Sequence, residues 1–434
     1  MADRLTAGLR VGVVGGGYAG MAAAVELADG GAEVTIFEAA KVPGGRARRV
    51  EVDGRALDNG LHILIGAYSE TLRLIERTCA PGEDPGLARL PLELAMHPGF
   101  RLRAPRLPAP LHLGIALLCA SGLRWRERLA AARFMAAMRR RAFRIDADTS
   151  VAALLLEQRQ PDRVRRLLWE PLCVSALNTA PDEASARVFL CVLRDSLSGP
   201  RAASDLLLPT VDFSALFPER AARYVQARGG SVRLGAAVEG VRRTQRGFEV
   251  DPGGLPFDRV VLAASPHRVA ALMAGHAELD GLRAQVQALR YQPIYSVYLQ
   301  YPPGTRLPFR MGGLEARYSQ WLFDRGQLCG QDGLLGVVIS AEGAHQDLPQ
   351  AALARAVHEE IGALVPGLAE PSWHRVIAEK RATFACTPGL QRPGNATPLA
   401  GLWLAGDYTA SEYPATLEAA VRSGVAAARL ALKP

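Results

Sequence analysis

Cysteine is scarce in this sequence of 434 residues, and so are long apolar runs. The six cysteines form no CxxC pair and lie near no cluster of histidines at metal-ligand spacing. We therefore expect no disulfide framework and no bound metal, and a reducing, cytoplasmic compartment. No stretch reaches the ~20 apolar residues that a membrane-spanning helix needs. The apolar run from Val11 is interrupted by glycines and by Glu26, which argues against a secretory signal peptide.

Lysine is nearly absent, since the chain contains only Lys41, Lys380 and Lys433. Arginine therefore carries almost all of the basic charge behind the net charge of +8. The arginines are spread along the chain without a zinc-finger, helix-turn-helix or RNA-binding signature, so we expect no nucleic-acid partner. A hydrophobic fraction of 49% with 22% charged residues is typical of a globular protein, and the length favours two domains.

The first informative pattern is a strand, a glycine turn, a helix and a second strand within residues 9–38. The turn Gly15-Gly16-Gly17-Tyr18-Ala19-Gly20 fits GxGxxG, and Glu38 ends the second strand 18 residues after Gly20. In this pattern the first glycine allows a tight turn, the second lets the backbone approach a pyrophosphate, and the third lets the helix pack closely on the strand. The free N–H groups of the helix start bind phosphate, and the acidic residue accepts hydrogen bonds from a ribose. A glycine turn without a ligand is the alternative.

Two further segments could contact a bound dinucleotide. Gly44-Gly45-Arg46 follows the acidic residue and brings backbone N–H groups and a fixed positive charge toward a diphosphate. Near the other end, Leu402–Asp407 reads as a strand that ends in Ala-Gly-Asp, and Pro414–Thr416 precedes a helix. Both segments resemble FAD motifs of flavoproteins, and the resemblance implies FAD rather than NAD. It also implies that the N-terminal dipole of that helix stabilises negative charge on a reduced flavin.

Together these segments resemble flavoproteins of the amine-oxidase and phytoene-desaturase type. In that family, the strand that corresponds to Arg233–Val238 lies on the adenine side. The resemblance implies FAD as the cofactor, and a cofactor site made of Gly15, Gly17, Tyr18, Ala19, Gly20, Glu38, Ala39, Gly44, Gly45, Arg46, Asn59, Gly60, Leu61, His62, Val238, Gly406, Asp407, Pro414, Ala415 and Thr416.

The rest of the chain alternates between helical and strand character. Residues 70–205 are predicted to be mostly helical with little strand, whereas 230–264 and 291–340 are predicted to be rich in strands. A strand at 401–405 and a helix from about Thr416 close the chain. We therefore expect an α/β protein in which a Rossmann-like FAD-binding domain, made of residues 1–70, 205–265 and 375–434, is interleaved with an α+β substrate domain, made of residues 71–204 and 266–374.

Segments outside the cofactor motifs narrow the resemblance to the hydroxysqualene dehydroxylase family. The matching segments are Leu57–His62, Gly66–Tyr68, Trp169–Leu172, Ala176–Thr179, Arg194–Leu197, Ser204–Pro209 and Leu216–Pro218. Members of that family often have glutamine where this chain has Leu61. The resemblance covers nearly the whole chain. It implies reductive removal of the hydroxyl of hydroxysqualene, a hydrophobic C30 isoprenoid, to give squalene in bacterial squalene and hopanoid synthesis, with electrons from an external donor.

Loss of an allylic hydroxyl as water requires a proton, and three residues are candidates for its delivery. His62 adjoins a flavin motif, and could donate a proton directly or position a water, or it could be a hydrogen-bonded core histidine. Asp58 and Asp195 lie in family-like segments, as does Asp205. The alternatives are a structural turn for Asp58 and an ion pair with Arg194 for Asp195. The sequence does not choose among them.

Residues 107–144 are predicted to contact a membrane. Leu107–Leu123 is apolar but contains two prolines, and residues 124–144 follow as a basic amphipathic segment. An uncharged C30 substrate resides in the bilayer, so an enzyme that takes it up there needs an apolar surface flanked by arginines. We therefore expect a peripheral position on the inner face of the membrane. The alternative is a buried helix of the substrate domain with solvated arginines.

Two other functions remain open at this point. A carotenoid desaturase or isomerase has the same fold and an apolar substrate, but a desaturase moves hydride from substrate to oxidised FAD. A non-catalytic flavin-binding carrier or escort protein would share the glycine motifs. The complete C-terminal flavin segment argues against the carrier, and the segments outside the cofactor motifs favour the dehydroxylase. An oxidase of polar amines fits less well, because the middle of the chain is rich in apolar residues.

Overall fold

A five-stranded parallel sheet holds together segments from the beginning, middle and end of the chain. The computed structural model describes residues 8–433, and its sheet has the strand order β10-β2-β1-β14-β20. The strands are β10 (Ser231–Leu234), β2 (Glu33–Glu38), β1 (Arg10–Val14), β14 (Arg259–Leu262) and β20 (Leu402–Leu404). The predicted strand, turn, helix and strand are thus present at β1, α1 (Tyr18–Asp29) and β2. The fold is of the α/β class.

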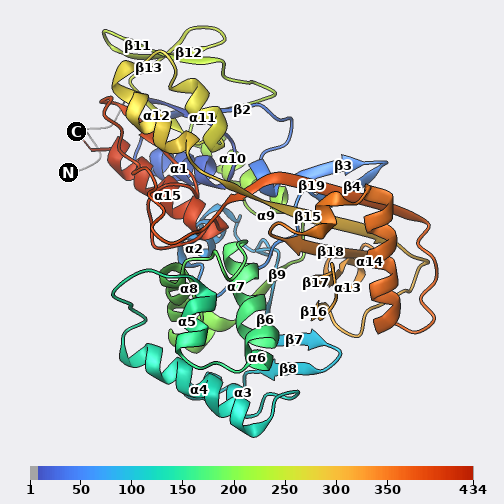
Figure 1. Ribbon diagram of the computed structural model, residues 1–434. Coiled ribbons are helices and arrows are strands. Elements are labelled where there is room, and N and C mark those ends of the chain that lie inside the picture. Colours follow the sequence, from blue (N-terminus) through green and yellow to red (C-terminus); the bar gives the residue numbers. More distant parts are fainter. Residues whose placement is uncertain (1–7, 434) are drawn as a thin grey trace.

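Helix α1 packs between two helices that come from distant parts of the sequence, α10 (Pro218–Gln226) and α15 (Leu417–Ala431). Figure 1 shows α1, α10 and α15 gathered beside the parallel sheet. The contact between α1 and α15 requires glycine at Gly424, because an added Cβ there would lie 2.1 Å from the carbonyl oxygen of Ala19. Ala19, Ala22, Ala23, Ala24 and Val25 of α1 are buried, which follows from packing on both sides.

A second, seven-stranded sheet has the order β19-β15-β18-β17-β16-β7-β8. Its pairs are antiparallel except for β16 with β7. Smaller sheets join β3 with β4, β5 and β6 with β9, and β11 through β13. The bounds of these strands are β3 (Arg49–Val52), β4 (Arg55–Asp58), β5 (Leu64–Ile65), β6 (Leu87–Leu90), β7 (Glu93–His97), β8 (Phe100–Arg103), β9 (Leu206–Pro209), β11 (Gly240–Thr244), β12 (Gly247–Asp251), β13 (Leu255–Phe257), β15 (Tyr291–Gln300), β16 (Met311–Leu314), β17 (Trp321–Asp324), β18 (Leu334–Ser340) and β19 (Trp373–Phe384).

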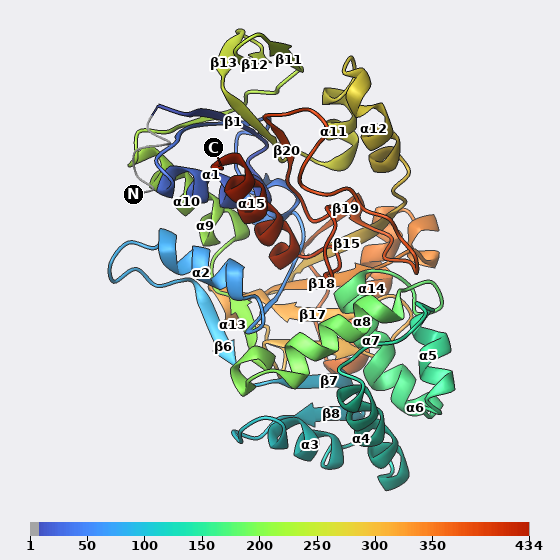
Figure 2. The same ribbon diagram turned by 90° about the vertical axis from the view of Figure 1, so that its left-hand side faces the viewer.

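Helices take up most of the chain between β6 and β9 in the sequence. They form the end of the molecule opposite β11–β13 (Figures 1 and 2). Two π-helical turns, Arg165–Trp169 and Arg194–Ser198, interrupt them. No helix within residues 8–433 is long and apolar enough to cross a bilayer. The remaining helices are α2 (Ser69–Thr78), α3 (Leu111–Leu118), α4 (Trp125–Arg140), α5 (Val151–Glu157), α6 (Asp162–Val164), α7 (Glu170–Leu177), α8 (Ala186–Leu193), α9 (Phe213–Leu216), α11 (Pro266–Leu272), α12 (Asp280–Gln287), α13 (Arg325–Cys329) and α14 (Gln350–Leu364).

One sequence-based expectation about elements is confirmed and one needs correction. Residues 70–205 are mostly helical with little strand, as expected, and the three short strands β6, β7 and β8 lie within them. These strands are four or five residues long, and β7 pairs with β16, about two hundred residues later. Their local sequence is therefore too short to indicate a strand. The strand expected at Arg233–Val238 is shorter than expected. Strand β10 ends at Leu234 and β11 begins at Gly240, so Val238 lies in an irregular segment between them.

Candidate functional site

The glycine turn between β1 and α1 has the geometry expected of a dinucleotide site. An added Cβ at Gly20 would lie 1.9 Å from the carbonyl oxygen of Gly15, so only glycine lets the helix start this close to the strand. Helix α1 begins after Gly17 with no side-chain cap and no acidic residue in its first turn. No side chain of the protein occupies this helix start, which suits it to an anion.

Gly17 and Gly45 lie side by side at ordinary contact distance. Gly44 donates a backbone hydrogen bond of 2.9 Å to Gly16, which holds the second glycine pair against the first. An added Cβ on Gly17 would find its nearest neighbour, the Cα of Gly45, at 3.8 Å. The protein itself does not demand glycine at position 17, whose φ is −76°. A ligand that approaches the backbone there would demand it, and a diphosphate fits this requirement.

Glu38 lies at the end of β2 with its carboxylate turned toward the glycine turn. The carboxylate accepts hydrogen bonds from the backbone N–H groups of Gly16, at 2.6 Å, and Ala40, at 2.8 Å. These two bonds fix the side chain beside the turn, while its remaining lone pairs can accept from ribose hydroxyls. Ala39 lies between the bonded residues. Glu38 thus has the position that the sequence predicts, and also stabilises the turn.

An ion pair links the two flavin-like motifs, which are far apart in the sequence. Arg46 donates a 2.7 Å hydrogen bond to the carboxylate of Asp407 and a second bond to the carbonyl of Ala382. Asn59 donates to the carbonyl of Arg46 at 3.1 Å, so this predicted cofactor residue supports the arginine. Burial opposes the charge of Arg46, but the contact with Asp407 raises the pKa overall. The arginine therefore keeps a fixed positive charge between the motifs.

The segment from Gly406 to Thr416 leads into α15. The hydroxyl of Ser423 accepts a 2.9 Å bond from the N–H of Gly406, and Thr416 caps α15 by accepting from Ala419 at 3.1 Å. The hydroxyl of Tyr408 is buried and has no hydrogen-bond partner within the described chain. An orphaned buried donor fits a bound group with acceptor atoms, as a flavin has. Pro414 and Ala415 lie directly before the helix cap, as predicted.

Val238 is buried, and its carbonyl accepts a hydrogen bond from the guanidinium of Arg268 in α11. That carbonyl is therefore already engaged within the protein. A contact of Val238 with adenine stays a prediction.

The carboxylate of Asp58 is fully enclosed and both of its oxygens are engaged. One oxygen accepts from the backbone N–H of Phe213, and the other from the guanidinium of Arg325, both at 2.9 Å. Burial raises the pKa of Asp58, while Arg325 and Phe213 oppose the rise. Since neither oxygen is left to reach a substrate, this geometry favours the structural alternative. The sequence did not indicate Arg325 as the partner, because it lies 267 residues away.

His62 has one engaged and one available ring nitrogen. Its Nδ1 lies 2.7 Å from the carbonyl oxygen of Gly60, and because a carbonyl only accepts, Nδ1 carries a proton. The ring packs against Phe213 at 5.3 Å between centroids. Burial lowers the pKa of His62, which favours the neutral ring. Nε2 is then an acceptor, so at neutral pH His62 suits holding a water better than donating a proton itself.

Asp195 lies in the π-helical turn Arg194–Ser198 and contacts the segment before α15. Its carboxylate accepts from Arg194 and from the hydroxyl of Tyr413, both at 2.7 Å. Burial raises the pKa of Asp195, but these hydrogen bonds outweigh it and the pKa is lowered overall. Asp195 is therefore ionised. The predicted ion pair with Arg194 exists, yet Tyr413 was not foreseen, because the recognised motif begins one residue later, at Pro414.

Asp205 is also engaged, because it pairs with Arg89 at 3.2 Å and with Arg201 at 3.1 Å. It is buried, and its backbone carbonyl accepts from Gly66. Asp205 therefore joins three segments of the chain.

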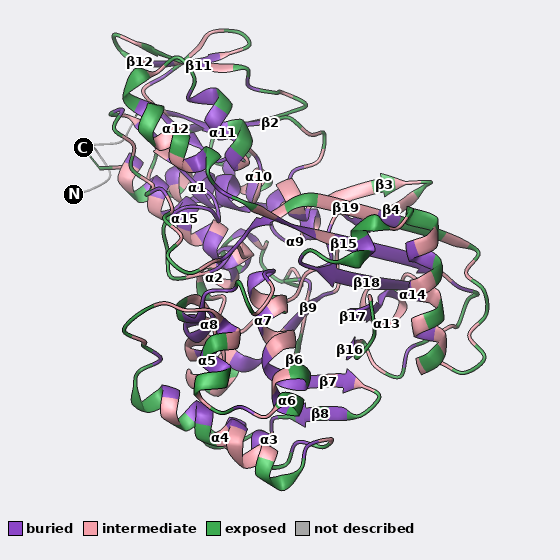
Figure 3. Cartoon of the chain, viewed as in Figure 1, coloured by how far each residue is buried: buried purple, intermediate pink, exposed green. Residues whose placement is uncertain are grey.

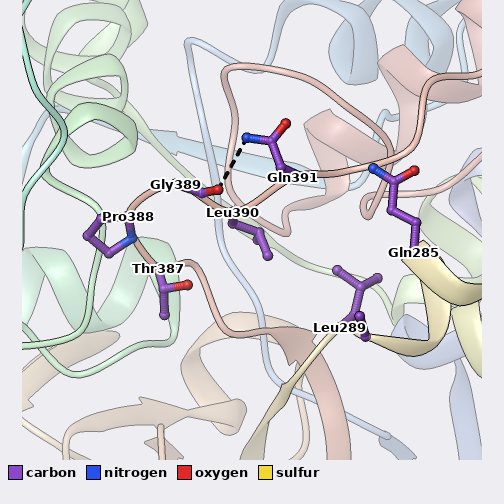
Figure 4. Close-up of a pocket in the computed structure, with 8 residues that line it drawn as sticks. Gln285, Leu289, Thr387, Pro388, Gly389, Leu390 and Gln391 are labelled. Carbon is purple, nitrogen blue, oxygen red and sulfur yellow. Dashed lines mark hydrogen bonds between the residues drawn. The ribbon is translucent and has the colours of Figure 1, made fainter.

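A cavity of about 350 Å³ lies between α12 and the segment 387–391 (Figure 4). Its lining consists of amide, hydroxyl and apolar groups, including Gln285, Leu289, Thr387 and Gln391, and the Gln391 amide donates to the carbonyl of Gly389 at 3.2 Å. None of the predicted catalytic or cofactor residues lines it. Without a titratable group, this cavity offers no proton donor for the predicted chemistry.

Comparison with known proteins places this geometry in a family. Residues 18–432 match the family of flavin-containing amine oxidoreductases. The chain belongs to this family. It is 31% identical to hydroxysqualene dehydroxylase of Rhodopseudomonas palustris, over 97% of both chains, and 26% identical to 15-cis-phytoene desaturase of Synechococcus elongatus, over 96% and 94%. A solved oxidoreductase from Methanosarcina mazei has the same fold, with a TM-score of 0.74 at 16% identity, over 97% of this chain and all of that one.

The chain is therefore an FAD-dependent oxidoreductase of the α/β class. The expectation of FAD and of an enzyme is confirmed by the family, and the absence of side chains at Gly17 and Gly45 fits the close approach of a diphosphate to the backbone. Which residues touch FAD and which act on the substrate stay predictions.

Proposed function

We propose that this enzyme uses reduced FAD to remove the hydroxyl group of hydroxysqualene, an allylic C30 alcohol, and so forms squalene. The observation that carries the proposal is the hydrogen bond between Tyr413 and Asp195. Arg194–Leu197 resembles dehydroxylases and lies outside the cofactor motifs, whereas Tyr413 adjoins the flavin motif at Pro414. The bond joins a substrate-type segment to a cofactor-type segment. The similarity to the dehydroxylase of R. palustris supports the same function.

The reaction breaks one carbon–oxygen bond and forms one carbon–hydrogen bond at the same carbon. The hydroxyl takes up a proton and leaves as water, either before or together with hydride transfer to the carbon. Bound FAD in its reduced form supplies the hydride and ends oxidised. Each turnover consumes two electrons, so an external donor has to restore the reduced state. The protein has to deliver the proton, stabilise the allylic cation and keep other water away from it.

Asp195 suits stabilisation of the cation, because it is ionised and held in place by Arg194 and Tyr413. A carboxylate with a lowered pKa is a weak proton donor but a fixed negative charge. His62 presents an accepting Nε2, and we assign it the role of holding the water that delivers the proton. Asp58 is assigned a structural role, because Arg325 and Phe213 occupy both of its oxygens.

The test is a single turnover of anaerobically reduced enzyme with hydroxysqualene in D₂O. One deuterium should appear at the former carbinol carbon, because the transferable hydrogen of reduced flavin exchanges with solvent, and one FAD should be oxidised per squalene. Squalene without deuterium under full exchange would contradict hydride delivery. Oxidised enzyme whose FAD is reduced by an isoprenoid substrate, with a new double bond formed in that substrate, would contradict the proposal and favour a desaturase, the function suggested by the 26% identity to phytoene desaturase.

Variants separate the role of Asp195 from its surroundings. Asp195→Asn should keep FAD and slow product formation by about 10²–10³-fold, since a fixed charge opposite the cation is lost. Glu412→Gln is the matched control. Glu412 contacts the same Arg194 at 3.0 Å, but its side chain is 71% exposed, so the rate should change less than about twofold. Equal effects of the two substitutions would remove Asp195 from the reaction.

A further inference from the structure

The arginines are spread along the chain, but the excess of basic over acidic residues is concentrated in one segment of the sequence. Residues 104–144 contain nine arginines and one acidic residue, Glu127. This surplus of eight equals the formal net charge of +8 of the whole chain, so all other residues together are balanced. A local excess of this size attracts an anionic surface. The arginines are Arg106, Arg124, Arg126, Arg128, Arg133, Arg139, Arg140, Arg141 and Arg144.

These nine arginines also differ from others of the chain in their contacts. None of them forms a salt bridge with any residue between 8 and 433, and all except Arg128 are exposed. Arg128 donates to the backbone carbonyls of Leu118 and Leu123 and so joins α3 to the start of α4. The fold leaves the charge of this segment without internal neutralisation.

Exposed apolar side chains gather in the same segment. Seven large hydrophobic side chains are exposed within the described chain, and five of them lie between residues 107 and 125. Leu111 (57% exposed), Ile115 (37%) and Leu118 (50%) are spaced i, i+4 and i+7, so they form one stripe along α3. Trp125, at the start of α4, is 68% exposed, and Leu107 lies just before α3.

Figures 1 and 2 place α3 and α4 at the end of the molecule farthest from β11–β13, and Figure 3 shows exposed residues along both helices. The inner face of α3, with Leu113, Ala116 and Leu117, belongs to one continuous apolar core cluster. That cluster extends to Leu61, the neighbour of His62. Helix α3 thus carries the apolar stripe on its solvent-exposed face and core residues on its buried face.

We propose that α3 and α4 form a docking surface for a bilayer that contains anionic lipid. The stripe Leu111–Ile115–Leu118 and the ring of Trp125 insert between headgroups, and the surrounding arginines contact lipid phosphates. Charge complementarity favours lipid, because a surplus of eight positive charges lies in the same segment as an apolar stripe that offers no hydrogen-bonding side chain. The inference deepens the proposed function, since a bilayer is where an uncharged C30 substrate resides.

The experiment measures binding of the FAD-loaded protein to phosphatidylcholine vesicles with and without 30% phosphatidylglycerol, by co-sedimentation at about 0.1 and 0.5 M salt, over which the Debye length falls. Leu111→Ser/Ile115→Ser/Leu118→Ser should weaken binding at least about tenfold, through lost apolar insertion. The matched control Leu156→Ser/Leu234→Ser changes exposed leucines of α5 and β10, and should bind like the wild type.

Charge is tested separately from apolar insertion. Arg139→Gln/Arg140→Gln/Arg141→Gln should weaken binding to anionic vesicles by about fivefold per arginine, and less at high salt. The control Arg243→Gln/Arg246→Gln/Arg355→Gln removes equal charge from exposed arginines elsewhere and should bind like the wild type. Quenching of tryptophan fluorescence by brominated lipid should be largely lost in Trp125→Phe.

Three outcomes would overturn the inference. They are equal weakening by the control variants, binding that is indifferent to all of these changes, and a wild-type dimer without lipid that Leu111→Ser/Ile115→Ser/Leu118→Ser makes monomeric. The last would make the stripe an interface between two copies of this chain. Activity on detergent-dispersed substrate should be unchanged in the triple serine variant. Failure of that activity in the wild type would refute the proposed function while leaving the vesicle result standing.

Discussion

At the scale of single residues, Gly17 and Gly20 are glycines for different reasons. A side chain at Gly20 would collide with the backbone of Gly15, whereas one at Gly17 would collide with nothing in the protein. Gly17→Val should therefore fold with a wild-type circular dichroism spectrum and purify without yellow colour. Gly20→Val should fail to fold stably. Normal flavin absorbance near 450 nm in Gly17→Val would refute the placement of FAD at this turn.

The pair of Asp58 and Arg325 predicts a loss of stability that is independent of catalysis. Asp58→Asn leaves the Arg325 guanidinium buried without its counterion, which costs about 3–5 kcal/mol of unfolding free energy. Asp58→Leu/Arg325→Leu should recover part of that loss, since no unpaired charge remains. Urea unfolding of the apoprotein measures both. If Asp58→Asn keeps wild-type stability but loses activity, Asp58 acts in the reaction instead.

The lowered pKa of His62 predicts a pH-dependent stability. Below the ordinary value of 6.5, the unfolded chain binds a proton at this residue while the folded chain stays neutral, so folding loses stability as the pH falls. His62→Gln removes the titration. The difference in unfolding free energy between wild type and His62→Gln should be constant above about pH 7.5 and shift against the wild type toward pH 5. A difference that does not change with pH would contradict a buried, neutral His62.

Which residues could be foreseen follows from where their partners lie. Gly15, Gly20 and Glu38 act within one short segment, so their spacing alone predicts their geometry. The partners of Asp58 and Asp195 are Arg325 and Tyr413, each more than two hundred residues away. The sequence shows that Asp58 is acidic, but only the folded structure shows that both of its carboxylate oxygens already accept hydrogen bonds from other residues.

At the scale of elements, length and periodicity decide what is predictable. Helix α1 and strands β1 and β2 follow a local pattern, and they form where expected. Strands β6, β7 and β8 have four or five residues each, and β7 is stabilised by β16, so their pairing depends on the folded chain. The same limit applies to the π-helical turn that positions Asp195, because its backbone irregularity has no residue signature.

Helix α2 depends on Glu418, which lies in the first turn of α15. The buried carboxylate accepts from the N–H groups of Glu70 and Thr71 at the start of α2, at 3.1 and 2.9 Å, and pairs with Arg422. Glu418→Ala should cost about 3 kcal/mol of unfolding free energy, because buried donors lose their acceptor. Amide exchange should rise first in α2. Glu418→Gln keeps an acceptor, so its unfolding free energy should lie between those of the wild type and Glu418→Ala. Equal amide protection of α2 in these three proteins would contradict this role.

At the scale of the whole molecule, the parallel sheet joins segments that lie far apart in the sequence. Strands β1, β10, β14 and β20 come from near residues 10, 230, 260 and 400, and only the recurrence of flavin-type motifs along the chain hinted at their association. The domain boundaries expected from the sequence stay a prediction. The ion pair of Arg46 and Asp407 belongs to this scale, because it joins the segment that follows β2 to the segment that follows β20.

A cofactor held by motifs from both ends of the chain should stabilise the molecule as one unit. Ligand that binds only the folded state adds about 2.7 kcal/mol at a free concentration of 100 Kd. For a chain of this length, that corresponds to a rise in Tm of about 3 °C. Added FAD should therefore raise the Tm of the wild-type apoprotein, measured by calorimetry, and should leave the Tm of Gly17→Val unchanged.

Arg46→Gln is informative at this scale, because it removes the link to Asp407 as well as a positive charge near the expected diphosphate. Its FAD-dependent rise should be smaller than that of the wild type. A full rise in Gly17→Val would show that FAD binds elsewhere, and no rise in the wild type would show that the two motifs do not act together on the cofactor.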